Sequence, residues 1–92
     1  MIIGFRHKGL ELFYRTGSTR GIYAAHANKL RQILTMLDTA REPQDMNLPW
    51  LRLHMLKGNL ATHWSVRVDG SWRVTFRLTR MGAELINYQN YH

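Results

Sequence analysis

The sequence predicts one α+β domain in which a long amphipathic helix packs on a β-sheet. Two patterns carry this prediction: apolar residues recur at helical spacing between about residues 23 and 40, and they alternate with polar residues between 64 and 79. The chain has 92 residues, of which 45% are hydrophobic, which suffices for one core but not for two. We therefore expect a single domain over residues 1–92.

The N-terminal residues predict a short strand followed by a short helix. Residues 1–6 form an apolar run that suits a strand. A short helix is predicted from Leu10 to Tyr14. Leu10, Phe13 and Tyr14 share one face of it, so we expect them in the core. The Thr-Gly-Ser-Thr sequence that begins at Thr16 supplies the terminating turn.

A second, longer helix is predicted from about Tyr23 to Ala40. Its apolar positions follow the i, i+3, i+4, i+7 rule, while charged residues fall largely on the other side. The apolar face consists of Ala27, Leu30, Ile33, Leu34 and Leu37. His26 is interpreted as a surface residue on the first turn of this helix. Residues 41–48 contain a proline and are expected to form a loop.

Residues 49–56 resume the period-two alternation and predict a half-buried strand. One side would carry Leu51, Leu53 and Met55, and the other Arg52 and His54. A Lys-Gly-Asn turn follows and would hold Lys57 at the rim of the sheet. A lysine in such a turn is most often a solvated surface residue.

The register of a hairpin at residues 64–79 follows from its apolar positions, because residues directly opposite each other share a face. A two-residue loop would oppose Val66 to Arg73, whereas a three-residue loop or its bulged equivalent pairs Val66 with Val74. The second arrangement is preferred, and it sets Arg67 opposite Arg73. Like charges across a strand pair are destabilising, so this placement indicates an anion-binding site.

A last strand is predicted at residues 83–88, after a turn at residues 79–82. An even loop would place Ala83 and Leu85 in the core. The arginine face would then carry Glu84, Ile86, Tyr88, Asn90 and His92. Alternation places three aromatic residues in the core, so we do not expect them to stack on nucleic acid. They are Trp64, Trp72 and Phe76.

The charge balance favours a polyanionic partner. Thirteen Lys and Arg against six Asp and Glu give a formal net charge of +7, and arginine outnumbers lysine ten to three. The absence of cysteine excludes disulfides and thiolate metal sites. His54 and His63 lie on adjacent predicted strands, but no third ligand has motif spacing, so we expect neither a metal nor a cofactor. No apolar run reaches a membrane span and no signal peptide is evident, so we expect a cytoplasmic protein without a membrane partner.

Four stretches, in order, resemble a known family: IIGFRHKGLE, LHMLKGN, WSVRVDGSWRVTF and INYQNYH. They resemble the HigB toxins of the RelE superfamily of bacterial type II toxin–antitoxin systems. The resemblance implies an α+β fold, with two N-terminal helices packed on a twisted, mainly antiparallel four- to five-stranded sheet. It also implies endonucleolytic cleavage of mRNA on the ribosome, with contacts to 16S ribosomal RNA. The implied partner is a HigA-type helix-turn-helix antitoxin, and operator DNA would be reached only through the antitoxin complex.

The resemblance also transfers a set of functional residues to this chain. These residues are Lys57, Arg67, Arg73, Asn90, Tyr91 and His92. The family usually has an acidic residue before the final Tyr-His, where this chain has Asn90. An amide keeps the hydrogen-bonding capacity of that position but not its negative charge.

Cleavage of this type needs no metal, because a ribose 2′-hydroxyl attacks the neighbouring phosphorus and the 5′-oxygen leaves. The protein must supply a base, cations around the phosphorane oxygens and an acid. Arg67 and Arg73 suit the second task, and His92, with an ordinary pKa of about 6.5, suits proton transfer. Lys57 would act as a base only with a strongly lowered pKa and would otherwise contact phosphate. Tyr91 would stack on a base or align the phosphate.

Two other interpretations remain open at the level of sequence. The first is a non-enzymatic RNA- or ribosome-binding module with the same fold. The second is a DNA-binding regulator, which the sequence disfavours because the only long helix has an aliphatic packing face and no helix-turn-helix partner.

Overall fold

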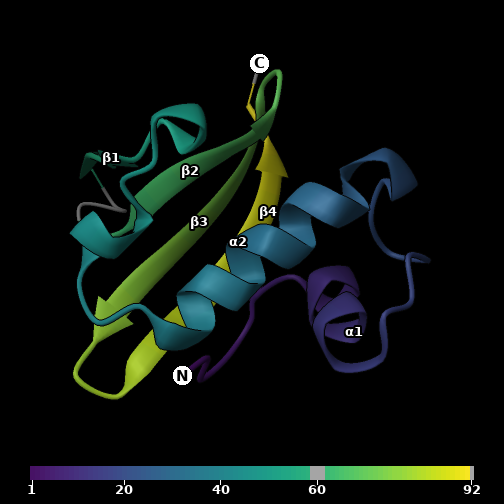
Figure 1. Ribbon diagram of the computed structural model, residues 1–92, viewed down its shortest axis with the longest axis horizontal. Helices are drawn as coiled ribbons and strands as arrows, with labels where there is room; N and C mark the ends of the chain where they lie inside the picture. Colours follow the sequence, from purple (N-terminus) through teal and green to yellow (C-terminus); the bar gives the residue numbers. More distant parts are fainter. Residues whose placement is uncertain (59–61, 92) are drawn as a thin grey trace.

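A four-stranded antiparallel sheet forms one layer of the molecule and two helices form the other (Figure 1). The computed structural model describes residues 1–58 and 62–91. The elements are α1 (Lys8–Thr16), η1 (Ala24–His26), α2 (Ala27–Thr39), η2 (Pro43–Met46), η3 (Pro49–Leu51), β1 (His54–Met55), β2 (Trp64–Asp69), β3 (Trp72–Thr79) and β4 (Gly82–Asn90), where η marks a 3-10 helix. This arrangement confirms the predicted α+β fold with two N-terminal helices on an antiparallel sheet.

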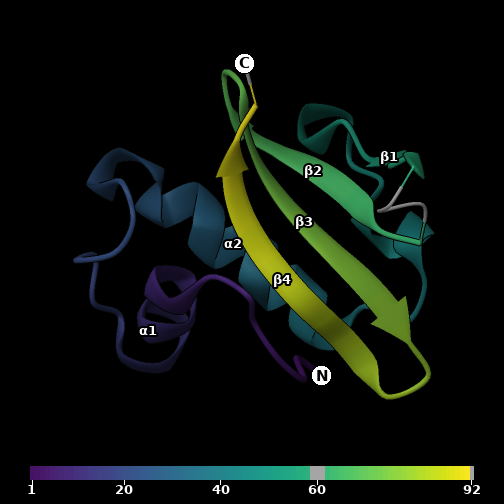
Figure 2. The same ribbon diagram turned by 180° about the vertical axis from the view of Figure 1, so that it is seen from behind.

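The strands follow the order β1-β2-β3-β4, so each strand pairs with its neighbour along the chain. The view from behind shows the strands in front of α2, which crosses the sheet diagonally (Figure 2). The end of β4 lies beside the turn between β2 and β3, whereas the N-terminus lies near the turn between β3 and β4 (Figure 1). Within the described residues, no helix is long and apolar enough to cross a membrane.

Helix α1 has a defined cap at each end and extends beyond the predicted segment. The imidazole Nδ1 of His7 accepts a hydrogen bond from the Leu10 N–H at 2.9 Å, which satisfies one of the unpaired N–H groups at the start of the helix. At the other end Gly17 adopts a left-handed φ of 79°, and its N–H donates to the Phe13 carbonyl. Leu10 and Phe13 are buried as predicted.

Helix α2 packs on the sheet through the predicted apolar face. Four of its side chains are buried, namely Leu30, Ile33, Leu34 and Leu37, while Ala27 is partly buried. The prediction that Tyr14 of α1 lies in the core is wrong, because its side chain is 38% exposed. Its hydroxyl donates to the Asp38 carboxylate of α2 at 2.8 Å, and this polar partner keeps the ring at the surface between the two helices.

The strand predicted at residues 1–6 forms only two isolated parallel bridges to β4. Ile2 bridges to Ala83 and Phe5 to Ile86. Between the two bridged positions of β4, Leu85 adopts a left-handed φ of 54°, which interrupts the ladder. The N-terminal segment therefore lies along β4 without becoming a fifth strand.

The strand predicted at residues 49–56 is wrong except at the two residues of β1. Pro49 begins the 3-10 helix η3, because proline lacks an N–H for a strand ladder and suits a first helical position. Arg52 then adopts a left-handed φ of 48°. Leu51 is fully buried as predicted, but Met55 is 55% exposed.

The predicted register of the β2–β3 hairpin is confirmed in its bulged form. Val66 pairs with Val74 and Arg67 with Arg73, and a register shift follows Arg67. Asp69 lies opposite Trp72 as a result. Burial of the alternate apolar residues confirms the core assignment, since Val66, Val74 and Phe76 are fully buried, while Trp64 and Trp72 pack against the core in part.

The predicted faces of β4 are wrong beyond its first residues. The left-handed backbone at Leu85 and a register shift against β3 change which residues point to the core. Leu85 is 37% exposed, whereas Ile86 and Tyr88 are buried in the core rather than placed on the arginine face. Gln89 takes the place opposite Arg73.

Candidate active site

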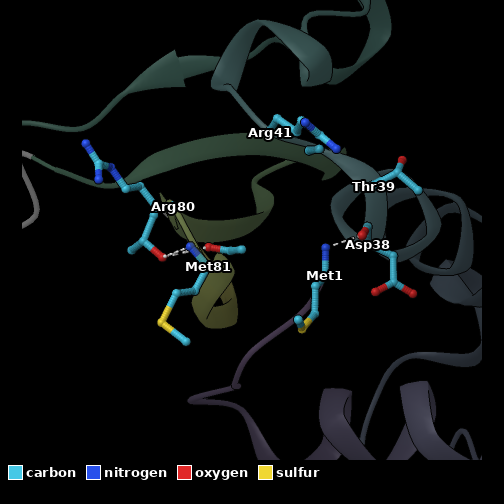
Figure 3. Close-up of a pocket in the computed structure, with 9 residues that line it drawn as sticks. Met1, Asp38, Thr39, Arg41, Arg80 and Met81 are labelled. Carbon is cyan, nitrogen blue, oxygen red and sulfur yellow. Dashed lines mark hydrogen bonds between the residues drawn. The ribbon is translucent and has the colours of Figure 1, made fainter.

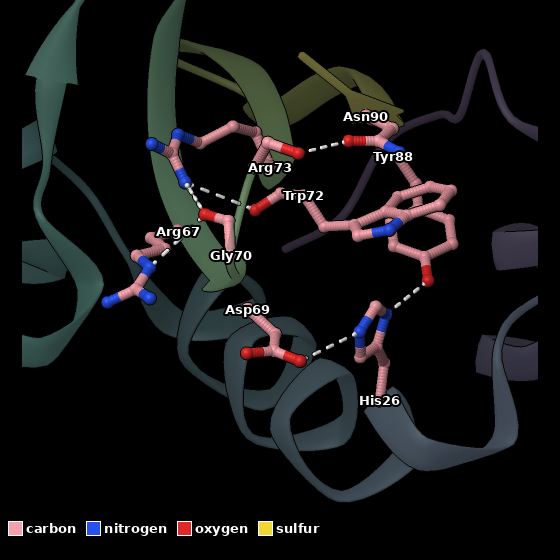
Figure 4. Close-up of polar contacts among 9 residues, drawn as sticks. His26, Arg67, Asp69, Gly70, Trp72, Arg73, Tyr88 and Asn90 are labelled. Carbon is pink, nitrogen blue, oxygen red and sulfur yellow. Dashed lines mark hydrogen bonds and ion pairs between the residues drawn. The ribbon is translucent and has the colours of Figure 1, made fainter. Parts of the chain in front are cut away.

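Two arginines face each other across β2 and β3, and a single carbonyl group holds both of them. Arg67 Nε donates to the Gly70 carbonyl at 3.3 Å, and Arg73 Nη1 donates to the same oxygen at 3.1 Å (Figure 4). Arg73 Nη1 also lies 3.3 Å from the Trp72 carbonyl. Within the described part of the chain, neither guanidinium has an ion-pair partner. Each guanidinium carries five N–H donors, so donors remain on both groups for an anion.

The end of β4 is tied to the turn of the same hairpin. Ser71 Oγ donates to Asn90 Oδ1, and the Tyr91 N–H donates to the Ser71 carbonyl at 2.9 Å. The Tyr91 hydroxyl donates to Gln89 Oε1 at 2.7 Å, and Gln89 lies opposite Arg73. These contacts bring Asn90 and Tyr91 to the turn of the hairpin, but Asn90 lies opposite Trp72 and therefore not on the arginine face where the sequence places it.

Two residues of the predicted set, Lys57 and His92, are not shown in contact with the arginine pair. Lys57 is exposed just after β1, on the side of β2 away from β3, which agrees with a place at the rim of the sheet. Within residues 1–58 and 62–91, Lys57 makes no side-chain hydrogen bond or ion pair with the arginines. His92 lies outside the described residues.

Sequence reasoning missed His54 as a candidate for proton transfer. His54 pairs with Ser65, which lies two residues before Arg67 and on the same face of β2. Its Nδ1 lies 3.1 Å from the Arg52 carbonyl. A carbonyl can only accept, so Nδ1 carries the proton and the neutral ring keeps its lone pair on Nε2. The alternation of residues 49–56 placed His54 on the polar side but gave no reason to select it.

A metal site is not formed by the histidines that the sequence places on adjacent strands. His63 is buried, and the Leu56 N–H donates to its carbonyl at 3.0 Å. Over the two described ranges, no group of three or more His, Asp or Glu side chains is close enough to hold a metal ion.

The prediction that His26 is a surface residue is wrong, because its side chain is buried. His26 Nδ1 lies 2.6 Å from the Tyr88 hydroxyl, and Nε2 lies 3.5 Å from the Asp69 carboxylate (Figure 4). The ring packs edge-to-face on Trp72 with a centroid distance of 5.7 Å. His26 precedes the regular turns of α2, so helical periodicity did not indicate which way it points.

The candidate site does not coincide with either of two cavities on the surface. A cavity of about 540 Å³ lies between the end of α2 and the turn from β3 to β4, where Arg41, Arg80 and Asp38 contribute to its lining (Figure 3). This turn is at the opposite end of β3 from the arginine pair. A smaller cavity of about 330 Å³ lies beside Tyr23 and Trp72. Neither Arg67 nor Arg73 lines these two cavities, and both side chains are partly exposed.

Comparison with known proteins gives a match over almost the whole chain. Residues 3–92 match the family described as RelE-like toxin of type II toxin-antitoxin system HigB. The chain is 38% identical to Endoribonuclease HigB of Proteus vulgaris over 92 residues, which cover both chains completely. It is 33% identical to Toxin HigB-1 of Vibrio cholerae over 94 residues, covering all of this chain and 98% of that protein.

Solved structures share the fold at lower sequence identity. The YoeB/ParE toxin from Agrobacterium tumefaciens superposes with a TM-score of 0.65 at 18% identity, covering 99% of this chain and 98% of that one. YafQ from E. coli gives a TM-score of 0.67 at 16% identity, covering 98% and 91%. At these identities the likeness concerns the fold alone.

Proposed function

This chain belongs to the family of RelE-like HigB toxins of type II toxin–antitoxin systems, and we propose from that premise that it cleaves mRNA on the translating ribosome without a metal ion. The observation that carries the chemistry is the pair of partly exposed arginines that are held opposite each other by the Gly70 carbonyl. Such a pair suits a phosphate better than any neutral group, because two guanidinium ions donate charge-assisted hydrogen bonds to its oxygens. The proposed compartment is the cytoplasm, where the ribosome translates.

The proposed reaction is attack by a ribose 2′-hydroxyl on the adjacent phosphorus. The bond from phosphorus to the 5′-oxygen breaks, which leaves a 2′,3′-cyclic phosphate on one product and a 5′-hydroxyl on the other. Negative charge grows on the two non-bridging oxygens as the phosphorane forms. Arg67 and Arg73 would donate to those oxygens, and their fixed positions would lower the cost of reorganisation at the transition state.

The proposed proton transfers fall to two histidines, His54 on β1 and His92 at the end of the sequence. His54 would accept the proton of the 2′-hydroxyl at Nε2, since its Nδ1 faces the Arg52 carbonyl. His92, the second residue after Asn90, would donate a proton to the leaving 5′-oxygen.

The remaining residues of the set would bind and position the RNA. Lys57 at the rim would contact a backbone phosphate. The Tyr91 hydroxyl is engaged by Gln89, so its half-exposed ring would stack on a base. Asn90 would hold the end of β4, and with it Tyr91 and His92, through its hydrogen bond from Ser71.

The test compares Arg73→Ala with Arg80→Ala in a cleavage assay on purified translating ribosomes. Both variants lose one positive charge, but Arg80 lies at the opposite turn of the sheet. We expect Arg73→Ala to lower the cleavage rate by roughly 10²- to 10³-fold and Arg80→Ala to cleave like the wild type. Cleavage by Arg73→Ala at the wild-type rate would overturn the site.

The chemistry of the new ends tests the proposed absence of a metal. Attack by the 2′-hydroxyl leaves a 5′-hydroxyl, which polynucleotide kinase labels without prior phosphatase treatment. Products with a 5′-phosphate would instead indicate attack by an activated water and would contradict the proposed reaction.

A second candidate function is a ribosome-binding module without catalysis, and Asn90 favours it because the family usually has a carboxylate there. The two functions differ in their products: a pure binder would slow translation and leave the mRNA intact. For either function we propose a HigA-type helix-turn-helix antitoxin as the neutralising partner and contacts to 16S ribosomal RNA as part of ribosome binding. Operator DNA would be bound only through the antitoxin complex. Co-purification with the product of an adjacent gene tests the antitoxin, and a tolerated protein without a partner would contradict it.

A further inference from the structure

Three segments that are far apart in the sequence meet at the buried side chain of His26. His26 ends η1 and is 6% exposed. Its Nδ1 lies 2.6 Å from the hydroxyl of Tyr88 on β4, and its Nε2 lies 3.5 Å from the carboxylate of Asp69 at the end of β2 (Figure 4). The imidazole therefore bridges the last strand and the turn of the hairpin.

The partners of His26 determine where its proton lies. The Asp69 carboxylate only accepts, so Nε2 carries a proton, and in the neutral form of the ring Nδ1 then accepts from the Tyr88 hydroxyl. Burial raises the pKa of Tyr88 above its usual value, so this hydroxyl keeps its proton at neutral pH. The result is a chain of donors that runs from Tyr88 through His26 to Asp69.

Aromatic packing fixes the orientation of the same ring. Tyr23 and Trp72 meet His26 edge-to-face, with centroid distances of 5.5 and 5.7 Å. Trp72 also packs on Tyr88 at 4.6 Å. An imidazole held in this way has little freedom to turn away from its two polar partners.

The bridge ends at the turn that holds the arginine pair. Asp69 directly precedes Gly70, whose carbonyl accepts from both Arg67 and Arg73, and Gly70 has a left-handed φ of 56°. Trp72 directly precedes Arg73. The helix side of the turn is thus anchored to His26, while the two guanidinium groups lie on the other side (Figure 4). Two like charges in this arrangement repel each other, so the turn needs an anchor of this kind.

We propose that His26 is a positioning residue for the arginine pair, because its bridge between Tyr88 and Asp69 fixes the Gly70 carbonyl on which both guanidinium groups depend. This inference rests on the proposed cleavage of RNA. His26 does not touch the substrate, since it lies on the helix side of the sheet. Its effect on cleavage passes through the placement of Arg67 and Arg73.

The experiment removes the polar links of His26 and keeps its volume. His26→Phe retains a buried ring and loses both hydrogen-bonding atoms. Ile33→Val is the matched control, because it weakens the packing of α2 on the sheet without touching the bridge. We expect His26→Phe to lower the single-turnover cleavage rate by roughly 10- to 100-fold, with ribosome binding within about twofold of wild type. Ile33→Val should cleave at the wild-type rate, and His26→Gln, which keeps a donor and an acceptor, should recover part of the loss.

A double-mutant cycle separates positioning from a general loss of stability. In the Arg73→Ala background, His26→Phe should cause a clearly smaller loss of cleavage than in the wild type, because one of the two groups that it positions is already absent. A merely structural His26 would instead lower the rate by the same factor in both backgrounds. Asp69→Ala provides a second route, since the Asp69 side chain is 74% exposed and its removal leaves the core intact.

The positioning role and the proposed function can fail separately, and each failure has its own result. If the wild type cleaves mRNA and His26→Phe or Asp69→Ala cleaves it at the same rate, the positioning role is contradicted while the proposed function stands. A wild type that leaves mRNA intact would contradict the proposed function. Positioning is then still measured directly, because the Nε–H resonances of Arg67 and Arg73 should shift in His26→Phe, and unchanged resonances would overturn it.

Discussion

Arg67 and Arg73 lie opposite each other although this placement opposes folding. The Gly70 carbonyl, which carries a partial negative charge, accepts from both and holds them in one direction. A bound phosphate would remove the remaining repulsion between the two groups. The placement of the pair therefore agrees with a role in phosphate binding, because like charges across a strand pair oppose folding unless an anion lies between them.

His54 gives a prediction at the scale of one residue. His54→Gln removes the basic Nε2, so we expect the cleavage rate to fall by roughly 10²- to 10⁴-fold without loss of ribosome binding. Met55→Ala is the neighbouring control on β1, because Met55 points to the other side of the strand. Single-turnover cleavage on stalled ribosomes measures both variants. Equal rates for His54→Gln and the wild type would remove His54 from the mechanism.

Sequence reasoning reached the arginine pair but not the histidine behind it. The pairing of Arg67 with Arg73 follows from local alternation on two strands, which has one register that buries the apolar residues. The burial of His26 depends on Tyr88, 62 residues away in the chain. No local pattern carries that contact, so the sequence predicts an exposed histidine on the first turn of the helix.

At the scale of elements, the sequence predicted α1, α2 and the β2–β3 hairpin because each has an uninterrupted period. It failed where one backbone position overrides the pattern. Leu85 in the left-handed region reverses the faces of β4, and Pro49 turns a predicted strand into a 3-10 helix. Leucine rarely adopts the left-handed conformation, so the residue type at position 85 gave no reason to predict it there.

The cap of α1 predicts how stability changes with pH. Burial lowers the pKa of His7, and its Nδ1 accepts from Leu10 only when the ring is unprotonated. Below about pH 6.5 the unfolded chain binds a proton that the folded state resists. The contribution of His7 is therefore complete above that pH and is lost as pH falls through the lower pKa of the folded protein. Burial lowers the pKa of His63 in the same direction, with Arg77 and Arg6 adding to it.

His7→Asn tests this prediction, because asparagine caps a helix without titrating. We expect the free energy of unfolding of the wild type to decrease between about pH 7.5 and 5, and that of His7→Asn to decrease by about 1 kcal/mol less. His63 remains in both proteins, so the decrease is reduced rather than abolished. Urea unfolding at several pH values measures the difference. Parallel curves for the two proteins would show that the cap is not coupled to protonation.

At the scale of the whole molecule, the arginine pair lies at one end of the sheet and a cavity of about 540 Å³ lies at the other (Figures 1 and 3). Arg41 and Arg80 line the far cavity, so positive charge is spread over both ends. The net charge of +7 therefore favours RNA over the whole surface. The arrangement around Gly70, rather than total charge, is what the proposed cleavage requires.

The most direct test of this account maps mRNA 5′ ends in cells that express the wild type or Arg73→Ala. We predict new 5′-hydroxyl ends within translated regions for the wild type only, together with growth arrest that Arg73→Ala relieves. Arg80→Ala should reproduce the wild-type ends. An absence of new ends with the wild type, or the same ends with Arg73→Ala, would contradict cleavage by the arginine pair.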